Sequence, residues 1–284
     1  MRLRLLTLNL QHGKPAVGSP RAGEPASAGV LHDLAAEIAP LDPDVVLLQE
    51  VDRRQRRSGG VDQAAVLAAD LGLPFWRFAP AFAGWVGGLR VPPRRWPGAW
   101  LRPAPARRRG AGWLAGGAPA YGVALLSRVP VASWHLLPLG GARLQVRPGG
   151  RPGRWMGGWA AASHEGRACL AAVLQTAAGP VTVAVTHFSV DPATARSQLR
   201  RCTDAVATLP GPAVLGGDLN LQPADVAAAT ALTPLAQALT FTNARPRRQI
   251  DHLLGSGVRA ADGGRAHHFS VSDHAGLAAD IVLP

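Results

Sequence analysis

The sequence predicts an α/β protein of mixed (α+β) topology, in which two β-sheets pack face to face and helices cover them outside. Strand-like apolar runs outnumber helix-like segments along the 284 residues. The strands occur both as hairpins and as strand–helix–strand units, which excludes a purely parallel sheet. Polar side chains also stand where several buried strands should end, and converging strand ends of this kind are typical of α/β active sites.

Composition indicates a globular protein, and the polar strand ends, which are scattered along the whole chain, favour one domain over residues 1–284 because a division would separate them. Hydrophobic residues make up 47% and charged residues 17% of the chain. No apolar run reaches the ~18 residues of a membrane-spanning helix, and no leader precedes the first strand at Arg2. We therefore predict a cytoplasmic protein without a transmembrane segment. The two cysteines, Cys169 and Cys202, lack metal-ligand spacing and are too few for a disulfide framework, so we interpret them as buried or inert thiols.

The formal net charge of +12 would ordinarily indicate a polyanionic partner. Only Lys14 is a lysine, however, and the chain is rich in Ala, Gly, Pro and Arg. A GC-rich coding sequence produces this combination whatever the function. The charge therefore permits a nucleic acid or an anionic membrane as partner without demonstrating either.

The first third of the chain alternates strand and helix patterns. Ser27 is a suitable N-cap for an amphipathic helix that Pro40 to Pro43 would stop, and the apolar residues before Leu71 recur at helical spacing. The expected elements are a strand over Arg2 to Asn9, a loop over Gly13 to Pro25, a helix over Ser27 to Ile38, a strand ending at Gln49-Glu50, a helix over Val61 to Leu71 and a strand over Phe75 to Pro80.

The remaining chain contains two expected hairpins and two helices. Proline in the first turn supports the longer helix. The hairpins join Tyr121 to Ser127 with Val131 to Pro138, and Arg167 to Thr176 with Val181 to Thr186; the helices cover Pro192 to Leu209 and Pro223 to Leu232, and the last strand covers Ala275 to Val282.

Two inserts interrupt this pattern, at about Gly84 to Pro119 and Gly140 to Gly166. Both are rich in Arg, Trp, Gly and Pro, and neither shows strand or helix periodicity. Loops of that length are usually functional or disordered. Because they contain none of the candidate catalytic residues, we expect them to determine the substrate rather than the chemistry.

The central motif is Gly216-Gly217-Asp218-Leu219-Asn220, which follows an apolar run. A carboxylate and an amide on one side of a strand end can hold a hard cation and an oxyanion together. The alternative is a polar turn that caps the next helix. Five further strand ends carry similar residues, namely Asn9, Gln49-Glu50, His187, Asp251-His252 and Ser272-Asp273-His274. Their number favours a shared site.

These residues, in this order, resemble the endonuclease/exonuclease/phosphatase superfamily. Gly217 to Asn220 and Ser272 to His274 are its most specific motifs here, and the resemblance extends from Asn9 to His274. It implies a four-layer α/β/β/α sandwich and a metal-dependent hydrolase of phosphate esters, in which an activated water attacks phosphorus in line.

The resemblance also implies a metal site. Glu50 follows four apolar residues, where a carboxylate without a cation would be costly. Glu50 and Asp273 are the expected acidic ligands, with Asn9 and Asp218 completing the shell. Oxygen ligands suit Mg²⁺ or Mn²⁺ rather than Zn²⁺. The alternative for Glu50 is an ion pair with one of Arg53 to Arg57.

Proton transfer is assigned to two histidines. His274 is the expected general base, with Asp251 fixing its tautomer. His187 would face the phosphate as a donor to the oxyanion or a proton source, and Asn9 and Asn220 would also bind the phosphate. A histidine is otherwise more often a satisfied core residue. His252 is expected on the opposite strand face, and His267 and His268 in a surface turn.

The chain departs from the superfamily pattern at three places, and the last two argue against the abasic-site branch. Gln11 replaces an acidic ligand of some branches, Val51-Asp52 follows Glu50 in place of Thr-Lys, and Thr186-His187-Phe188 replaces a tyrosine segment. The chain is closer to histidine-bearing branches, which include sphingomyelinase-like and uncharacterised bacterial hydrolases. Gly59 to Gln63 is also similar to those branches.

Several functions stay open at this point. A nuclease would use the Arg and Trp inserts as a basic stacking surface. A phosphodiesterase of lipid headgroups would use them for peripheral membrane contact. A catalytically dead binding module is disfavoured because every metal and proton-transfer position is chemically competent.

Overall fold

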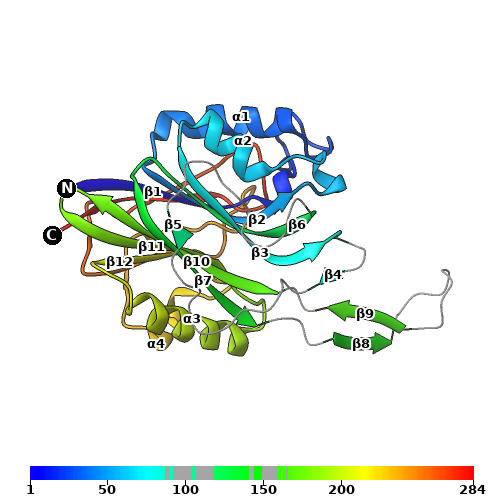
Figure 1. The fold of residues 1–284 in the computed structure, drawn as a ribbon. Coiled ribbons are helices and arrows are strands. Elements are labelled where there is room, and N and C mark those ends of the chain that lie inside the picture. Colours follow the sequence, from blue (N-terminus) through cyan, green and yellow to red (C-terminus); the bar gives the residue numbers. More distant parts are fainter. Residues whose placement is uncertain (87–89, 92–103, 106–117, 141–143, 149–158, 164–165) are drawn as a thin grey trace.

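The computed structural model describes residues 1–86, 90–91, 104–105, 118–140, 144–148, 159–163 and 166–284. Two mixed β-sheets stack face to face, α1 and α2 cover the outer side of one, and α3 and α4 cover the other (Figure 1). This arrangement confirms the α/β/β/α sandwich.

The first sheet has the strand order β15-β17-β1-β2-β6-β3-β4, and β16 also pairs with β17. Only β1 and β2 run parallel among its pairs; β17, β6 and β3 continue the sheet by antiparallel pairing. The strands are β1 (Arg2–Asn9), β2 (Val45–Arg53), β3 (Phe75–Gly84), β4 (Arg90–Val91), β6 (Ala120–Ser127), β15 (Arg259–Ala260), β16 (Arg265–His267) and β17 (Gly276–Val282).

The second sheet has the order β13-β14-β12-β11-β10-β7-β5. Here β11 and β12 run parallel, while β10 and β14 flank them in antiparallel pairs. The strands are β5 (Ala104–Pro105), β7 (Val131–Gly140), β10 (Arg167–Thr176), β11 (Gly179–His187), β12 (Ala213–Asp218), β13 (Thr233–Pro234) and β14 (Asp251–Ser256).

Capping side chains define where three of the helices begin. The Ser27 hydroxyl accepts from the Val30 amide, as predicted, and Asp62 and Asp191 accept from amides three residues later. The cap at Asp62 starts the second helix two residues after the predicted Val61. The helices are α1 (Ala28–Ile38), α2 (Gln63–Asp70), α3 (Pro192–Val206) and α4 (Pro223–Ala229), so the last two end before the predicted Leu209 and Leu232.

Three apolar layers hold the sandwich together. The alternation along β1 shows their arrangement: Leu3 and Leu5 pack between the sheets, while Leu6 and Leu8 pack against α1 and α2. Leu199 of α3 belongs to a third layer beneath the second sheet. Burial on both faces explains why the central strands are continuous apolar runs.

Strand β2 continues beyond the predicted end at Glu50, as far as Arg53. Its pairing with β6 shifts between Leu48 and Val51, and Glu50 has a φ of 53° within this bulge. An apolar run followed by charged residues indicated a strand end, but Asp52 and Arg53 are buried in the sheet. The bulge thus changes the direction of one side chain without ending the strand.

Most of the two predicted inserts lies outside the described residues, so their role in choosing the substrate stays a prediction. Within them, β4 and β5 extend the two large sheets, and β8 (Leu144–Pro148) pairs with β9 (Trp159–Ser163). Strands β3 and β7 also run further than predicted, to Gly84 and Gly140. No helix in the described part of the chain is long and apolar enough to span a membrane.

Candidate active site

Six strands meet at one edge of the sandwich. Strands β1, β11 and β12 end there, β2 passes it with the bulge at Glu50, and β14 and β17 begin there because they run antiparallel to their neighbours. They border a pocket of about 570 Å³, which we call the site pocket. Its lining residues are Glu50, Arg167, His187, Val190, Pro192, Asp218, Asn220, Gln222, Asp225, Phe241, Arg248, Ile250 and His274.

The turn after β12 fixes Asp218 and Asn220. A Cβ atom on Gly217 would lie 2.0 Å from the Thr186 carbonyl oxygen, so the close approach of β11 and β12 requires glycine. Asn220 has a φ of 51°, and its backbone amide donates to Asp218 Oδ1 at 3.0 Å. Its side-chain nitrogen donates to the Phe188 carbonyl at 3.1 Å. These bonds hold both side chains at the pocket edge.

Asn9 connects carboxylates from the two sheets. Its side-chain nitrogen donates to Asp218 Oδ2 at 3.0 Å and to Glu50 Oε1 at 3.2 Å, while its oxygen accepts from the Gln11 amide at 2.9 Å. The bulge in β2 brings Glu50 into this contact. In this arrangement Asn9 braces two candidate metal ligands, and its own oxygen is already engaged.

The surroundings of Asp218 disfavour the ionised form of its carboxyl group. Burial, together with the negative charge of Asp251, raises the pKa of the Asp218 carboxyl to about 7. Asp251 Oδ1 is buried and has no hydrogen-bond partner among the described residues. Crowded buried carboxylates with an unpaired oxygen are the surroundings that a divalent cation would relieve.

The residues present therefore fit a metal ion, and one group of described residues could hold it. Ligand atoms of Asp218, Asp251 and His274 all lie within 4.8 Å of one another. Glu50 joins Asp218 through their shared bond to Asn9. Asp273 lies further out: its side chain is 44% exposed, and Oδ1 is 4.0 Å from His274 Nε2.

His274 is hydrogen-bonded to Asp251, whose Oδ2 lies 2.9 Å from Nδ1. Thr240 donates to the same carboxylate oxygen at 2.6 Å, and the Phe241 ring packs 4.9 Å from the imidazole, centroid to centroid. Burial alone would lower the pKa of His274. The charge and hydrogen bond of Asp251, with Asp218 and Asp273, outweigh burial and raise that pKa to about 9.

The surroundings of His187 favour its neutral form, whereas those of His274 favour the protonated form. An Arg167 guanidinium nitrogen lies 3.0 Å from its Nδ1. A guanidinium can only donate, so Nδ1 accepts and the hydrogen of the neutral ring is on Nε2. Nε2 points at Asp218 Oδ2, 3.4 Å away. Burial, then the charges of Arg167 and His274, lower the pKa of His187 well below its usual value.

Residues 6–274 match the model of the endonuclease/exonuclease/phosphatase family. The chain belongs to this family. Its members are phosphoesterases and nucleases, so the protein is a hydrolase that acts on phosphate esters.

Solved structures with the same fold include other members of the family. One, from Bacteroides vulgatus, has a TM-score of 0.64 at 17% identity, with all of both chains covered. Another, from Beutenbergia cavernae, has a TM-score of 0.62 at 22% identity over 99% of this chain and 72% of its own. D. rerio TDP2 complexed with single strand DNA product has a TM-score of 0.59 at 14% identity over 99% of both chains. No curated protein matches the chain.

Within this family fold, the sequence prediction missed Arg167, Phe241 and Arg248, which line the pocket, and Thr240, which donates to Asp251. Arg167 could have been found from the expected hairpin, because antiparallel pairing of β10 with β11 places the start of one beside the end of the other. Thr240, Phe241 and Arg248 lie in the irregular segment before β14, where no periodic pattern indicates which side chains point inward.

The other histidines in the described part of the chain lie outside the site pocket. His252 is buried and contacts the Leu221 carbonyl through Nε2 at 2.8 Å. His268 Nδ1 contacts Asn243 at 2.9 Å. His267, predicted in a surface turn, instead belongs to β16, because Arg265 to His267 pair with the start of β17.

Proposed function

We propose that this protein hydrolyses a phosphodiester bond of a nucleic acid with the help of Mg²⁺ or Mn²⁺. The observation that carries the proposal is the placement of two differently tuned histidines beside Asp218. His274, paired with Asp251, is 3.8 Å from Asp218 Oδ2, and His187, paired with Arg167, is 3.4 Å from the same atom. One imidazole is adapted to take a proton and the other to donate a hydrogen bond.

The metal would be held by Glu50, Asp218 and Asp273, while Asn9, also expected as a ligand from the sequence, would position Glu50 and Asp218 through its hydrogen bonds. When bound, such an ion neutralises charge developing on the phosphate and lowers the pKa of water. The raised pKa of Asp218 and the unpaired Asp251 oxygen support a cation at this position.

His274 would act as the general base through Nε2. The Asp251 carboxylate keeps the other ring nitrogen protonated and stabilises the imidazolium formed when the attacking water loses its proton. A pKa of about 9 would leave His274 protonated at neutral pH. Added positive charge in the pocket lowers that pKa toward the range of an effective base.

His187 and Asn220 would bind the developing oxyanion. The neutral His187 ring offers its Nε2 hydrogen, and Asn220 uses one of its two amide hydrogens on Phe188 and keeps the other. Because these donors are neutral and held in place by neighbours, they need little rearrangement as the charge develops.

A nucleic acid is the first substrate to test. Arg167, Arg248 and Phe241 line the pocket, and the Arg248 guanidinium lies 4.8 Å from the Phe241 ring centroid. Guanidinium and aromatic groups together suit a phosphate backbone with stacked bases. The shared fold of D. rerio TDP2, solved with a single strand DNA product, supports this choice.

The test is a hydrolysis panel with Mg²⁺, Mn²⁺ or excess EDTA. Substrates are bis(p-nitrophenyl) phosphate, supercoiled DNA, single-stranded DNA, RNA, sphingomyelin vesicles and phosphate monoesters. Metal-dependent cleavage of a nucleic acid by the wild type but not by Glu50→Gln is the expected result, with exposed His32→Ala as a control. Preferred cleavage of sphingomyelin would replace the nuclease proposal, and full activity in EDTA would exclude the metal.

We further propose that the chain is one domain, since the site takes Asn9 and Glu50 from one sheet and His187, Asp218 and Asp251 from the other. A single cooperative unfolding transition, followed by two spectroscopic probes, tests this. The cytoplasmic location indicated by the sequence stays a prediction.

A further inference from the structure

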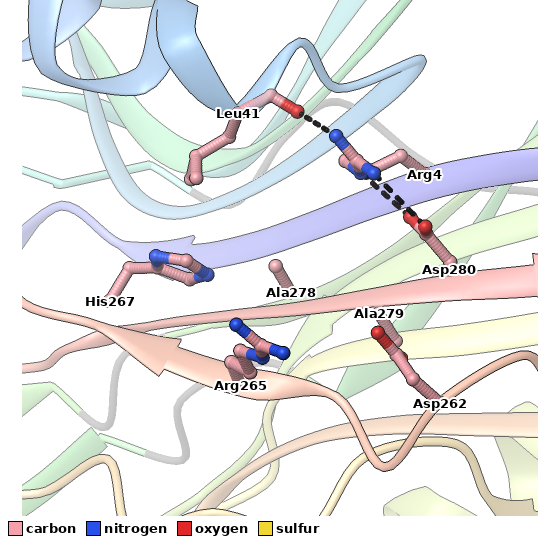
Figure 2. A pocket seen from close by; sticks show the side chains of 8 residues that line it. All are labelled: Arg4, Leu41, Asp262, Arg265, His267, Ala278, Ala279 and Asp280. Atoms are coloured by element: carbon pink, nitrogen blue, oxygen red, sulfur yellow. Dashed lines mark hydrogen bonds and ion pairs between the residues drawn. The ribbon is translucent and has the colours of Figure 1, made fainter.

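A second pocket lies on the outer face of the first sheet, away from the site pocket. It has a volume of about 280 Å³ and shares no lining residue with the site pocket. Its lining residues are Arg4, Leu41, Asp262, Arg265, His267, Ala278, Ala279 and Asp280 (Figure 2). Arg4 stands five residues before Asn9 on β1, about 16 Å along the strand from the edge where the candidate active site lies. We call this second pocket the Arg265 pocket.

One side of the Arg265 pocket is formed by an ion pair between Arg4 and Asp280. Arg4 donates to both carboxylate oxygens of Asp280, at 2.7 and 3.0 Å, and to the Leu41 carbonyl at 2.7 Å. The hydrogen bond from Arg4 is the main reason that the pKa of Asp280 is lowered. These two residues neutralise each other and form a fixed wall (Figure 2).

The opposite side carries two nitrogen groups that are not used. Among the described residues, neither the Arg265 guanidinium nor the His267 imidazole has a hydrogen bond or ion pair, although both border the pocket (Figure 2). The His267 ring stacks only on Phe269, with centroids 6.3 Å apart. Burial, then the charges of Arg265, His268 and Arg4, lower the pKa of His267. The Arg265 guanidinium near this ring, which is not neutralised by an ion pair with a described residue, can attract an anion.

The base of the pocket is small and mixed in character. Ala278 contributes only a methyl group, and Leu41 adds an apolar side chain above it (Figure 2). Asp262 borders the pocket at the end away from His267, and its Oδ1 accepts from the Gly264 amide at 3.1 Å. Its second oxygen remains able to accept from a ligand hydroxyl or amino group.

We propose that the Arg265 pocket binds a small phosphomonoester that carries a hydroxyl group. Its phosphate contacts Arg265 and His267, its hydroxyl faces Asp262, and its body lies over Ala278 beside Leu41. Guanidinium groups recognise phosphate oxygens in pairs, and an unpaired one at a pocket wall is available without breaking an existing ion pair. A nucleotide and the glycerophosphate part of a lipid headgroup share this chemistry.

Calorimetric titration in EDTA tests the proposal with inorganic phosphate, adenosine 5′-monophosphate, glycerol 3-phosphate and adenosine. We expect saturable binding of at least one phosphomonoester and none of adenosine. Arg265→Gln and His267→Ala should each weaken that binding about tenfold or more, because each removes a phosphate donor. Arg259→Gln, a neighbouring exposed arginine on β15 outside the pocket, should change it less than twofold.

Two further variants make the result specific. Ala278→Val should also abolish binding by filling the base, whereas His187→Ala should not, since it lies in the other pocket. Hydrolysis of bis(p-nitrophenyl) phosphate by Arg265→Gln should stay within twofold of wild type. Equal losses in the Arg265 and Arg259 variants would overturn the proposal, as would the absence of saturable binding at millimolar ligand. Tighter binding of adenosine 5′-monophosphate would identify the ligand as a nucleotide, and tighter binding of glycerol 3-phosphate would identify it as part of a lipid headgroup.

Discussion

At the site pocket, Asp218, Asp251, His187 and His274 each contact another charged or titratable group, whereas in the Arg265 pocket Arg265 and His267 form no hydrogen bond or ion pair with a described residue. Asp, Arg and His occur in both. Burial, together with the charge of Asp251, raises the pKa of Asp218 to about 7, while pairing with Arg4 lowers the pKa of Asp280. The charge of the ligand that each pocket would bind therefore depends on which of its groups lack a partner. A cation suits the site pocket, and an anion suits the Arg265 pocket.

The largest effect should come from removing carboxylates of the site pocket. Glu50→Gln or Asp218→Asn, like excess EDTA, should lower hydrolysis of bis(p-nitrophenyl) phosphate by about 10³-fold or more, because the cation that stabilises the transition state is lost. Steady-state rates with Mg²⁺ measure this. Asp262→Asn in the Arg265 pocket should leave the rate unchanged, and a matching loss there would remove the distinction between the pockets.

The next largest effect concerns the His274 pair. Positioned proton transfer contributes about 10²- to 10⁴-fold, so His274→Ala and Asp251→Asn should each lower kcat by a factor in that range. The double variant should be little worse than either single one, since the two residues act as a unit. His32→Ala, an exposed histidine paired with Asp70, is the control. Additive losses in the double variant would contradict the pairing.

A smaller effect should follow from changing Arg167. Arg167→Gln removes the positive charge beside His187, so the pKa of His187 should rise and kcat should fall about tenfold. Histidine NMR titration of the metal-free protein measures the pKa directly. Arg248→Gln removes a charge from the same pocket but not from His187 Nδ1, and it should shift that pKa less. Equal shifts would assign the effect to general charge rather than to contact.

The smallest effect is a difference in how stability depends on pH in EDTA. The folded pKa of Asp218 is raised, so the folded state holds a proton that the unfolded state has already lost, and this carboxyl destabilises the protein increasingly as pH rises toward 7. The free energy of unfolding of Asp218→Asn, measured with urea, should therefore increase relative to that of wild type between pH 5 and pH 8.

Asp280→Asn provides the contrast. The folded pKa of Asp280 is lowered, so its stabilising contribution is present above the usual pKa of an aspartate and is lost only at lower pH. The stability difference from wild type should then be the same at pH 5 and pH 8. If the stability difference from wild type changed with pH as steeply for Asp280→Asn as for Asp218→Asn, burial rather than pairing would determine the pKa of both carboxyl groups.

Local patterns in the sequence predict the layers of the fold and the sheet edge where the candidate site lies. Continuous apolar runs such as Val45 to Leu48 indicate strands buried on both faces, and polar residues after them mark the carboxyl ends, since period and burial are local properties. The family motifs around Asp218 and His274 were readable for the same reason. The bulge at Glu50 was not, because it depends on the register between β2 and β6.

Which side chains contact one another depends on the tertiary structure. Arg167 reaches His187 because β10 pairs with β11, and Asn9 can contact Asp218 of the second sheet as well as Glu50 of its own because the two sheets stack face to face. The Arg265 pocket likewise exists because β16 lies beside β17 next to Arg4. A pKa and a free hydrogen-bond donor depend on neighbours within a few ångströms, and no local pattern along the chain encodes which neighbours those will be.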